Sequence, residues 1–191
     1  GSTNCGTAEG EVWETFTLQA RPDGTLAGEA TQTMAKGCAN KRTVTFTRTG
    51  DADVNSLPDP AALPPRVTSP AAALRGRYHL LSVQPNGFKD QGDYVVRTDC
   101  LRAGDRCVSL LHTAPATAMV LVYADGTWNY DREFDGTCGR GRNTHVRIVV
   151  PFALPQPPQD PIMTLSGNGH EELTGGCPST DVQVTLTRTG D

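Results

Sequence analysis

Val184-Thr-Leu-Thr-Arg-Thr-Gly-Asp191 closes the chain, and nearly the same stretch, Val44-Thr-Phe-Thr-Arg-Thr-Gly-Asp51, occurs much earlier in it. The two stretches differ at one position, where Phe46 corresponds to Leu186. Chance rarely produces such a match in 191 residues, so the chain contains a duplicated unit. Alternating Val and Thr are typical of a β-strand, and the duplicated unit is therefore expected to be built from strands.

The match between the two copies extends upstream of these stretches. A constant offset relates four residues of the first copy to four of the second, namely Leu26, Gly28, Gly37 and Cys38 to Leu165, Gly167, Gly176 and Cys177. With a few inserted loop residues, Cys5-Gly6 also corresponds to Cys138-Gly139. The second copy is complete from about Gly76 to Asp191, whereas the first contains only the counterpart of its last three strands.

The six cysteines form pairs that follow from the repeat. The alignment predicts Cys5–Cys38 and its counterpart Cys138–Cys177, which leaves Cys100 and Cys107 to clip a hairpin. Zinc binding is the alternative use, but the sequence has no C-x-x-C and no His at ligand spacing from a Cys, so no metal is expected. Disulfides indicate an oxidising compartment, so the chain is expected to be secreted, periplasmic or exposed at the cell surface.

The composition suits an all-β protein with many turns, because 20 Gly and 14 Pro accompany an apolar content of 37%. The net charge of -4 argues against binding nucleic acid, which needs a basic surface. No apolar run approaches the ~18 residues of a membrane-spanning helix. Nor is a signal peptide recognisable, so any export signal or membrane anchor is expected outside this sequence.

Strand patterns divide the chain into three parts. Residues 1–51 are expected to hold three strands, residues 52–75 form a semi-rigid Pro/Ala-rich linker, and residues 76–191 form the complete unit. The first part has strand patterns at Glu11–Gln19, Thr25–Met34 and Arg42–Thr49. The complete unit has eight more, at Arg77–Gln84, Asp93–Thr98, Val108–Thr113, Met119–Ala124, Thr127–Phe134, Thr144–Leu154, Ile162–Glu172 and Asp181–Thr189.

Local signals refine this picture. Asp125-Gly126 predicts a tight hairpin between two strands, and Pro151 is expected to interrupt or end its strand or to lie at a sheet edge. We therefore expect antiparallel sheets, with one eight-stranded barrel- or sandwich-like unit and a three-stranded partial repeat. The partial repeat needs a cover for its apolar face. It can pack on the complete unit, which is the expectation we favour, complete a sheet in another chain, or belong to a longer natural protein.

Two groups of residues are candidates for binding. Aromatic residues are concentrated in the first five strands of the complete unit, and either they pack in its core or they line a ligand cavity of an eight-stranded closed sheet. These residues are Tyr78, Tyr94, Tyr123, Trp128 and Tyr130. Arg140 and Arg142 follow Cys138-Gly139 in a Gly-rich turn, where they either contact an anion or remain solvated.

Other motifs point to ordinary structural roles rather than to catalysis. The four histidines, His79, His112, His145 and His170, are expected to be exposed or hydrogen-bonded within strands. His170-Glu171-Glu172 lacks the second His of a metalloprotease motif, and Asp51-Ala-Asp53-Val-Asn55 lacks the Gly and Glu that complete a calcium loop. There is no nucleophile elbow or Walker loop, and no cofactor is expected.

The complete unit resembles a known family through its disulfide and turn positions. An opening Gly76-Arg-Tyr78 strand, the pair Cys100 and Cys107, Gly126-Thr-Trp128, then Cys138 and Gly176-Cys177 precede a final Thr-rich strand. This arrangement is similar to the extracytoplasmic C-terminal modules of mycobacterial membrane-anchored serine/threonine kinases and related exported proteins. The resemblance implies a cell-surface sensor joined by one transmembrane helix, outside this sequence, to a cytosolic kinase domain.

The expected function is therefore that of a non-catalytic sensor, ligand-binding or dimerisation domain. Its partner would be a small-molecule, cell-wall or protein ligand, or a second copy in a homodimer. One alternative is an independent secreted or cell-wall binding or inhibitor module. Another is a small cell-wall hydrolase, in which an Asp/Glu pair from different strands would perform the chemistry.

Overall fold

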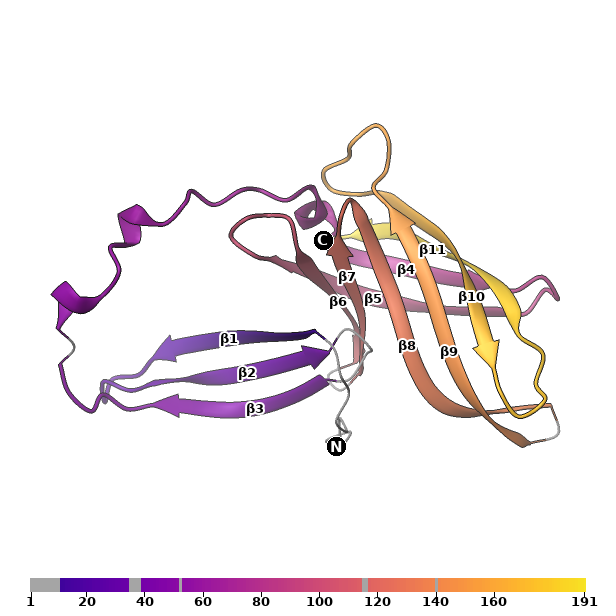
Figure 1. Ribbon diagram of the computed structural model, residues 1–191, viewed down its shortest axis with the longest axis horizontal. Coiled ribbons are helices and arrows are strands. Elements are labelled where there is room, and N and C mark those ends of the chain that lie inside the picture. The colour runs from indigo at the N-terminus through magenta and orange to yellow at the C-terminus, as the bar shows by residue number, and fades with distance from the viewer. Residues whose placement is uncertain (1–10, 35–38, 52, 115–116, 140) are drawn as a thin grey trace.

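The computed structural model describes residues 11–34, 39–51, 53–114, 117–139 and 141–191. Its strands form two separate antiparallel sheets, one with three strands and one closed into an eight-stranded barrel (Figure 1). The all-β fold expected from the sequence is therefore confirmed, and the complete unit is a barrel rather than a sandwich.

The N-terminal sheet has the order β1-β2-β3. Its strands are β1 (Val12–Ala20), β2 (Leu26–Met34) and β3 (Ala39–Phe46). Gly24, with φ of 80°, supplies the left-handed residue of the turn between β1 and β2. All three expected strands are present, although β3 ends at Phe46 rather than at Thr49.

The barrel is an up-and-down meander in which each strand pairs with the next along the chain, and β11 closes it by pairing with β4. Its strands are β4 (Gly76–Val83), β5 (Lys89–Cys100), β6 (Cys107–Ala114), β7 (Thr117–Ala124), β8 (Thr127–Cys138), β9 (Arg142–Ala153), β10 (Thr164–Leu173) and β11 (Thr180–Gly190). Closure of the sheet leaves the barrel without a free edge.

The barrel contains both the predicted Asp125-Gly126 hairpin and Pro151, whose strand was expected to be interrupted or to lie at an edge. Asp125 and Gly126 have φ of 52° and 80°, as the predicted tight hairpin between β7 and β8 requires. Pro151, in contrast, neither interrupts nor ends β9. It pairs with Asn129 of β8. On the other side of β9, the pairing with β10 covers only Val146–Val149 and stops before Pro151. Pro151 therefore lies where β9 has no ladder partner on one side, so its missing amide hydrogen costs little.

Inward-pointing side chains fill the barrel. Several large inward-pointing side chains are at most 2% exposed. They are Tyr78, Leu111, Leu121, Trp128, Val150, Phe152, Leu165 and Leu186. Along β8, β10 and β11 they alternate with outward-pointing polar residues, whereas β6 and β7 carry aliphatic residues on both faces. The core of the molecule is therefore the barrel interior.

A short 3-10 helix closes one end of the barrel. The linker contains η1 (Val54–Ser56), η2 (Pro60–Ala62) and η3 (Pro70–Ala73). Ser69 caps η3 by accepting a hydrogen bond from the Ala71 amide at 3.3 Å. Ala71 and Leu74 are fully buried in the barrel core. We call this the closed end of the barrel.

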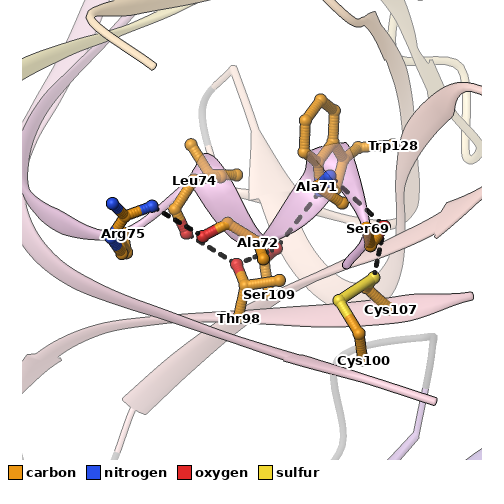
Figure 2. The surroundings of a disulfide bond; sticks show 10 residues. All are labelled: Ser69, Ala71, Ala72, Leu74, Arg75, Thr98, Cys100, Cys107, Ser109 and Trp128. Atoms are coloured by element: carbon orange, nitrogen blue, oxygen red, sulfur yellow. Dashed lines mark hydrogen bonds between the residues drawn. A yellow bond between two sulfur atoms is a disulfide. The ribbon is translucent and has the colours of Figure 1, made fainter. Parts of the chain in front are cut away.

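A chain of hydrogen bonds ties the closed end to the barrel wall (Figure 2). The Thr98 hydroxyl donates to the Leu74 carbonyl at 2.6 Å. Ser109 must therefore donate to Thr98, whose oxygen lies 2.7 Å away, and Ser109 in turn accepts from Nε1 of Trp128 at 3.2 Å. Each of these buried polar groups has a partner, so the chain fixes η3 in place.

Two disulfides join neighbouring elements, as predicted from the cysteines. Cys100–Cys107 links the end of β5 to the start of β6 next to Ser69 (Figure 2). Cys138–Cys177 links the end of β8 to the loop before β11. The predicted pair Cys5–Cys38 lies outside the described residues. The two bonds indicate an oxidising, extracytoplasmic environment.

The N-terminal sheet contacts the outer wall of the barrel through Trp13 of β1. The ring packs against a cluster of outward-pointing aliphatic side chains on β6 and β7, Val108, Leu110, Val120 and Val122. An ion pair between Glu11 and Arg106 supports this contact. Trp13 lies on the opposite face of β1 from Val12, Phe16 and Leu18, which remain exposed. The partial repeat therefore packs on the complete unit, as expected, but through its other face, and the complete unit does not cover the apolar face.

Candidate functional site

All five predicted pocket aromatics point into the barrel, but three of them lie in its closed half. Tyr78 and Trp128 are fully buried, and the rings of Tyr123 and Trp128 lie 4.9 Å apart. The Tyr78 hydroxyl donates to the Ile162 carbonyl at 2.6 Å. These three side chains fit the core-packing interpretation. Tyr94 and Tyr130 lie nearer the other end of the barrel.

At that other end, solvent reaches the barrel interior. The inward-pointing side chains of Tyr94, Arg132, Phe134, Ile148 and Glu171 are partly exposed, whereas those of the closed half are not. β8 pairs with β7 only over Thr127–Asn129, so the wall is less complete at this end and water can reach these side chains. We call this group, together with Tyr130, the barrel mouth.

Arg132 is the unusual member of the barrel mouth. Its guanidinium carbon lies 4.9 Å from the centre of the Phe134 ring, a cation–π contact. Burial raises the pKa of Tyr130, and the nearby Arg132 guanidinium opposes this rise. Among the described residues, no carboxylate lies within 4.0 Å of Arg132. Arg147, which points outward from β9, instead pairs with Asp131 at 3.0 Å. Arg132 thus presents a positive charge that has aromatic partners but no counter-ion.

Acidic and amide groups lie on the rim of the barrel mouth. Ile148 lies directly opposite Arg132 on one side and Glu171 on the other, so the two charged residues flank it. Gln84 donates to Glu171 at 2.8 Å. Burial, and then the charge of Asp90, raises the pKa of Tyr94. Its phenol is therefore neutral at pH 7 and can both donate and accept hydrogen bonds.

This arrangement can hold a small ligand that combines an anionic group with an apolar or aromatic body. A guanidinium with two parallel donors matches a carboxylate or a phosphate, and the rings of Tyr94 and Phe134 supply apolar surface beside it. The sequence placed Arg132 on the same strand face as Trp128 and Tyr130, but we did not predict it as a site residue. A charged residue on an apolar face was the available signal.

The predicted anion contact of Arg140 and Arg142 is only partly described. Arg140 lies outside the described residues. Arg142 is exposed at the start of β9, close to the loop that holds Gly176. The prediction for this pair therefore stays a prediction.

A separate surface lies on the N-terminal sheet. One face of it carries large apolar side chains that are roughly half exposed, Val12, Phe16, Leu18, Leu26 and Phe46. Phe16 and Phe46 contact each other edge to face, with ring centres 6.3 Å apart. We call this surface the apolar face of β1–β3.

Three histidines share one arrangement on the outer wall of the barrel. Each lies directly opposite an aspartate of the neighbouring strand and meets it through Nδ1 at 2.8 to 2.9 Å. The pairs are His79–Asp93, His145–Asp135 and His170–Asp181. These histidines are hydrogen-bonded surface residues, as expected. The fourth, His112, is exposed, and its pKa is lowered by partial burial and by the charges of Arg97 and Lys41.

A shallow groove of about 640 Å³ lies beside the β8–β9 hairpin. Its lining includes His145 and a single carboxylate, that of Asp135, together with glycine, threonine and asparagine residues. The hydrolase alternative requires two carboxylates that face one bond. This groove does not bring such a pair together.

Across the described ranges, no group of three or more His, Cys, Asp or Glu side chains could hold a metal ion. In the candidate calcium loop, the Asp53 carboxylate accepts the Asn55 amide at 3.0 Å, as in an ordinary turn. None of the helices in the described part of the chain is long and apolar enough to cross a membrane.

The chain matches no protein-family model, and comparisons with curated proteins and with solved structures give no significant match. The resemblance to kinase sensor modules therefore stays a prediction from the sequence.

Proposed function

We propose that this chain is an extracytoplasmic, non-catalytic sensor domain that binds a small anionic ligand in the mouth of its barrel. The observation that carries the proposal is the guanidinium of Arg132, which lies inside the barrel against Tyr130 and Phe134 rather than beside a carboxylate. Eight-stranded barrels are just wide enough to hold one small ligand. The closed end provides the floor of such a site, because Leu74 and Trp128 are fully buried there.

The balance of charge explains why an anion suits this site. Partial burial removes water from the Arg132 guanidinium, which is unfavourable while no opposite charge lies beside it. A bound carboxylate would offset this desolvation penalty. Glu171 and Asp90 on the rim oppose a strongly charged anion, so a ligand with a single negative charge and an apolar body fits best. Decanoate has both features and is a suitable probe.

Titration calorimetry with decanoate tests the proposal. Charge-assisted hydrogen bonds contribute about 1.5–3 kcal/mol, so Arg132→Gln should weaken binding by roughly 10- to 150-fold. Arg147→Gln is the matched control, because Arg147 lies on the neighbouring strand, points outward and should leave binding unchanged. Equal affinities of the two variants, or no binding by the unsubstituted chain, would refute the proposal.

The cellular role that we propose follows from the resemblance to kinase modules. The domain would be joined to a cytosolic serine/threonine kinase, and a ligand would act by binding one arrangement of the attached partners more tightly than another. The gene sequence upstream tests this part: a kinase domain followed by a transmembrane helix supports it. A signal peptide alone would instead favour the secreted binding or inhibitor module.

Homodimer formation remains part of the prediction for such a receptor. Sedimentation velocity at micromolar concentrations, with and without decanoate, measures it directly. A monomer under both conditions would remove dimerisation from the proposed mechanism while leaving ligand binding in place.

A further inference from the structure

The N-terminal sheet and the last strands of the barrel share one pairing register. Leu26 pairs with Phe46 in the N-terminal sheet, and their counterparts Leu165 and Leu186 pair in the barrel. One step further, Gly28 pairs with Val44, as Gly167 pairs with Val184. Because a slip of one residue would turn every side chain to the other face, β2–β3 and β10–β11 present equivalent faces.

The equivalent faces differ sharply in exposure. Leu26 is 43% exposed and Phe46 is 48% exposed, whereas Leu165 and Leu186 are each 1% exposed. The buried pair lies in the barrel core, where the other strands of the barrel cover it. The same inward pattern thus exists twice, but only one copy has its cover.

A glycine at the same position in both copies lets a neighbouring strand approach closely. A Cβ atom at Gly28 would lie 1.8 Å from the carbonyl oxygen of Thr17, and one at Gly167 would lie 2.3 Å from that of Pro151. Glycines that admit such close approach are the devices by which barrel walls coil. An isolated three-stranded sheet has no need for such a close approach.

The free edges of the N-terminal sheet are those that a barrel would use. In the complete barrel, β11 pairs with β4 and β9 pairs with β8. Their counterparts β3 and β1 are the two edge strands of the N-terminal sheet. The missing cover must therefore pair with both edges and lie over the apolar face, which is what β4–β8 do in the barrel.

We infer that β1–β3 are the last three strands of a second eight-stranded barrel, whose first five strands precede residue 1 in the natural polypeptide. In the complete unit β4–β8 come before β9–β11, and the two copies end at equivalent residues, Asp51 and Asp191. A second copy of this chain fits less well, since its β4–β8 already close on its own β9–β11. The inference goes beyond the proposed ligand site, which lies in the complete barrel.

Hydrogen exchange read by mass spectrometry tests this inference on the natural polypeptide with its upstream segment. The amides of β1 and β3 that face the free edges should exchange at least 100-fold more slowly there than in the 191-residue chain. Their protection should approach that of β9 and β11. Unchanged exchange, or an upstream sequence without five strand patterns, would overturn the inference.

Two matched substitutions distinguish a cover supplied by upstream strands from one supplied by a second copy. In the longer polypeptide, Phe46→Asp should abolish the added protection, because Phe46 would point into the second barrel. Thr45→Asp, one residue away on the opposite face, should retain it. Protection that instead appears in the 191-residue chain and rises with its concentration would assign the face to a second copy and refute the inference.

Discussion

Leu165→Ala and Leu26→Ala form a matched pair, because the same residue occupies the same repeat position in two environments. Leu165 lies in the barrel core and is 1% exposed. Its truncation leaves a cavity in a packed interior, for which a loss of about 2–5 kcal/mol in the free energy of unfolding is expected. Leu26 is 43% exposed on the apolar face of β1–β3. Truncation there opens no enclosed cavity, so the barrel should lose less than about 0.5 kcal/mol.

Urea denaturation followed by tryptophan fluorescence measures both effects. The chain has 2 Trp residues, and Trp13→Phe leaves Trp128, in the barrel core, as the reporter. With a slope of about 2 kcal/mol/M, in the middle of the usual range, Leu165→Ala should lower the midpoint by roughly 1–2.5 M urea. The midpoint of Leu26→Ala should stay within experimental error of its parent.

Two results would refute the reasoning behind this pair. An equal loss in both variants would mean that the apolar face of β1–β3 is covered in the 191-residue chain. A loss below about 1 kcal/mol for Leu165→Ala would mean that the barrel interior is not packed as described.

Three further predictions concern buried polar and titratable groups. Ser109→Ala should cost the barrel about 1–3 kcal/mol, because it leaves the Trp128 indole nitrogen without a partner; the exposed Ser166→Ala is the control, and equal urea midpoints would contradict the prediction. Burial raises the pKa of all 4 tyrosines. Above pH ~10 the unfolded chain therefore loses protons that the folded chain keeps, and stability should fall. Absorbance at 295 nm should then show phenolate only as the chain unfolds, and reversible titration of a folded tyrosine near pH 10 would count against it. The lowered pKa of His112 means that its contribution to stability is present above pH ~6.5 and is lost as the pH falls. Lys41→Gln should raise this pKa in an NMR titration, and no change would show that β3 does not approach the barrel wall.

Much of the fold could be predicted because its signals are local. Alternation along the chain revealed all eleven strands, and Asp125-Gly126 marked its hairpin. The repeat predicted Cys138–Cys177, since matching cysteines recur at matching positions. These features depend on neighbouring residues or on the repeat itself, which are visible in a single sequence.

The remaining features depend on contacts between distant residues. Closure into a barrel rests on the pairing of β4 with β11, which no local pattern encodes. The role of Ser69 and Leu74 at the closed end could not be seen in a Pro- and Ala-rich stretch. Alternation along β8 puts Arg132 on the inward face, but whether a described carboxylate lies beside it depends on which side chains the neighbouring strands bring to it.

The aliphatic cluster beneath Trp13 affects the design of truncated fragments of this chain. Val108, Leu110, Val120 and Val122 point away from the barrel interior and are nevertheless buried. A fragment cut at the linker would expose this stripe to water on an otherwise polar wall, where it would promote aggregation. A shortened version intended for ligand studies should therefore replace outward-pointing members of the stripe with threonine or lysine.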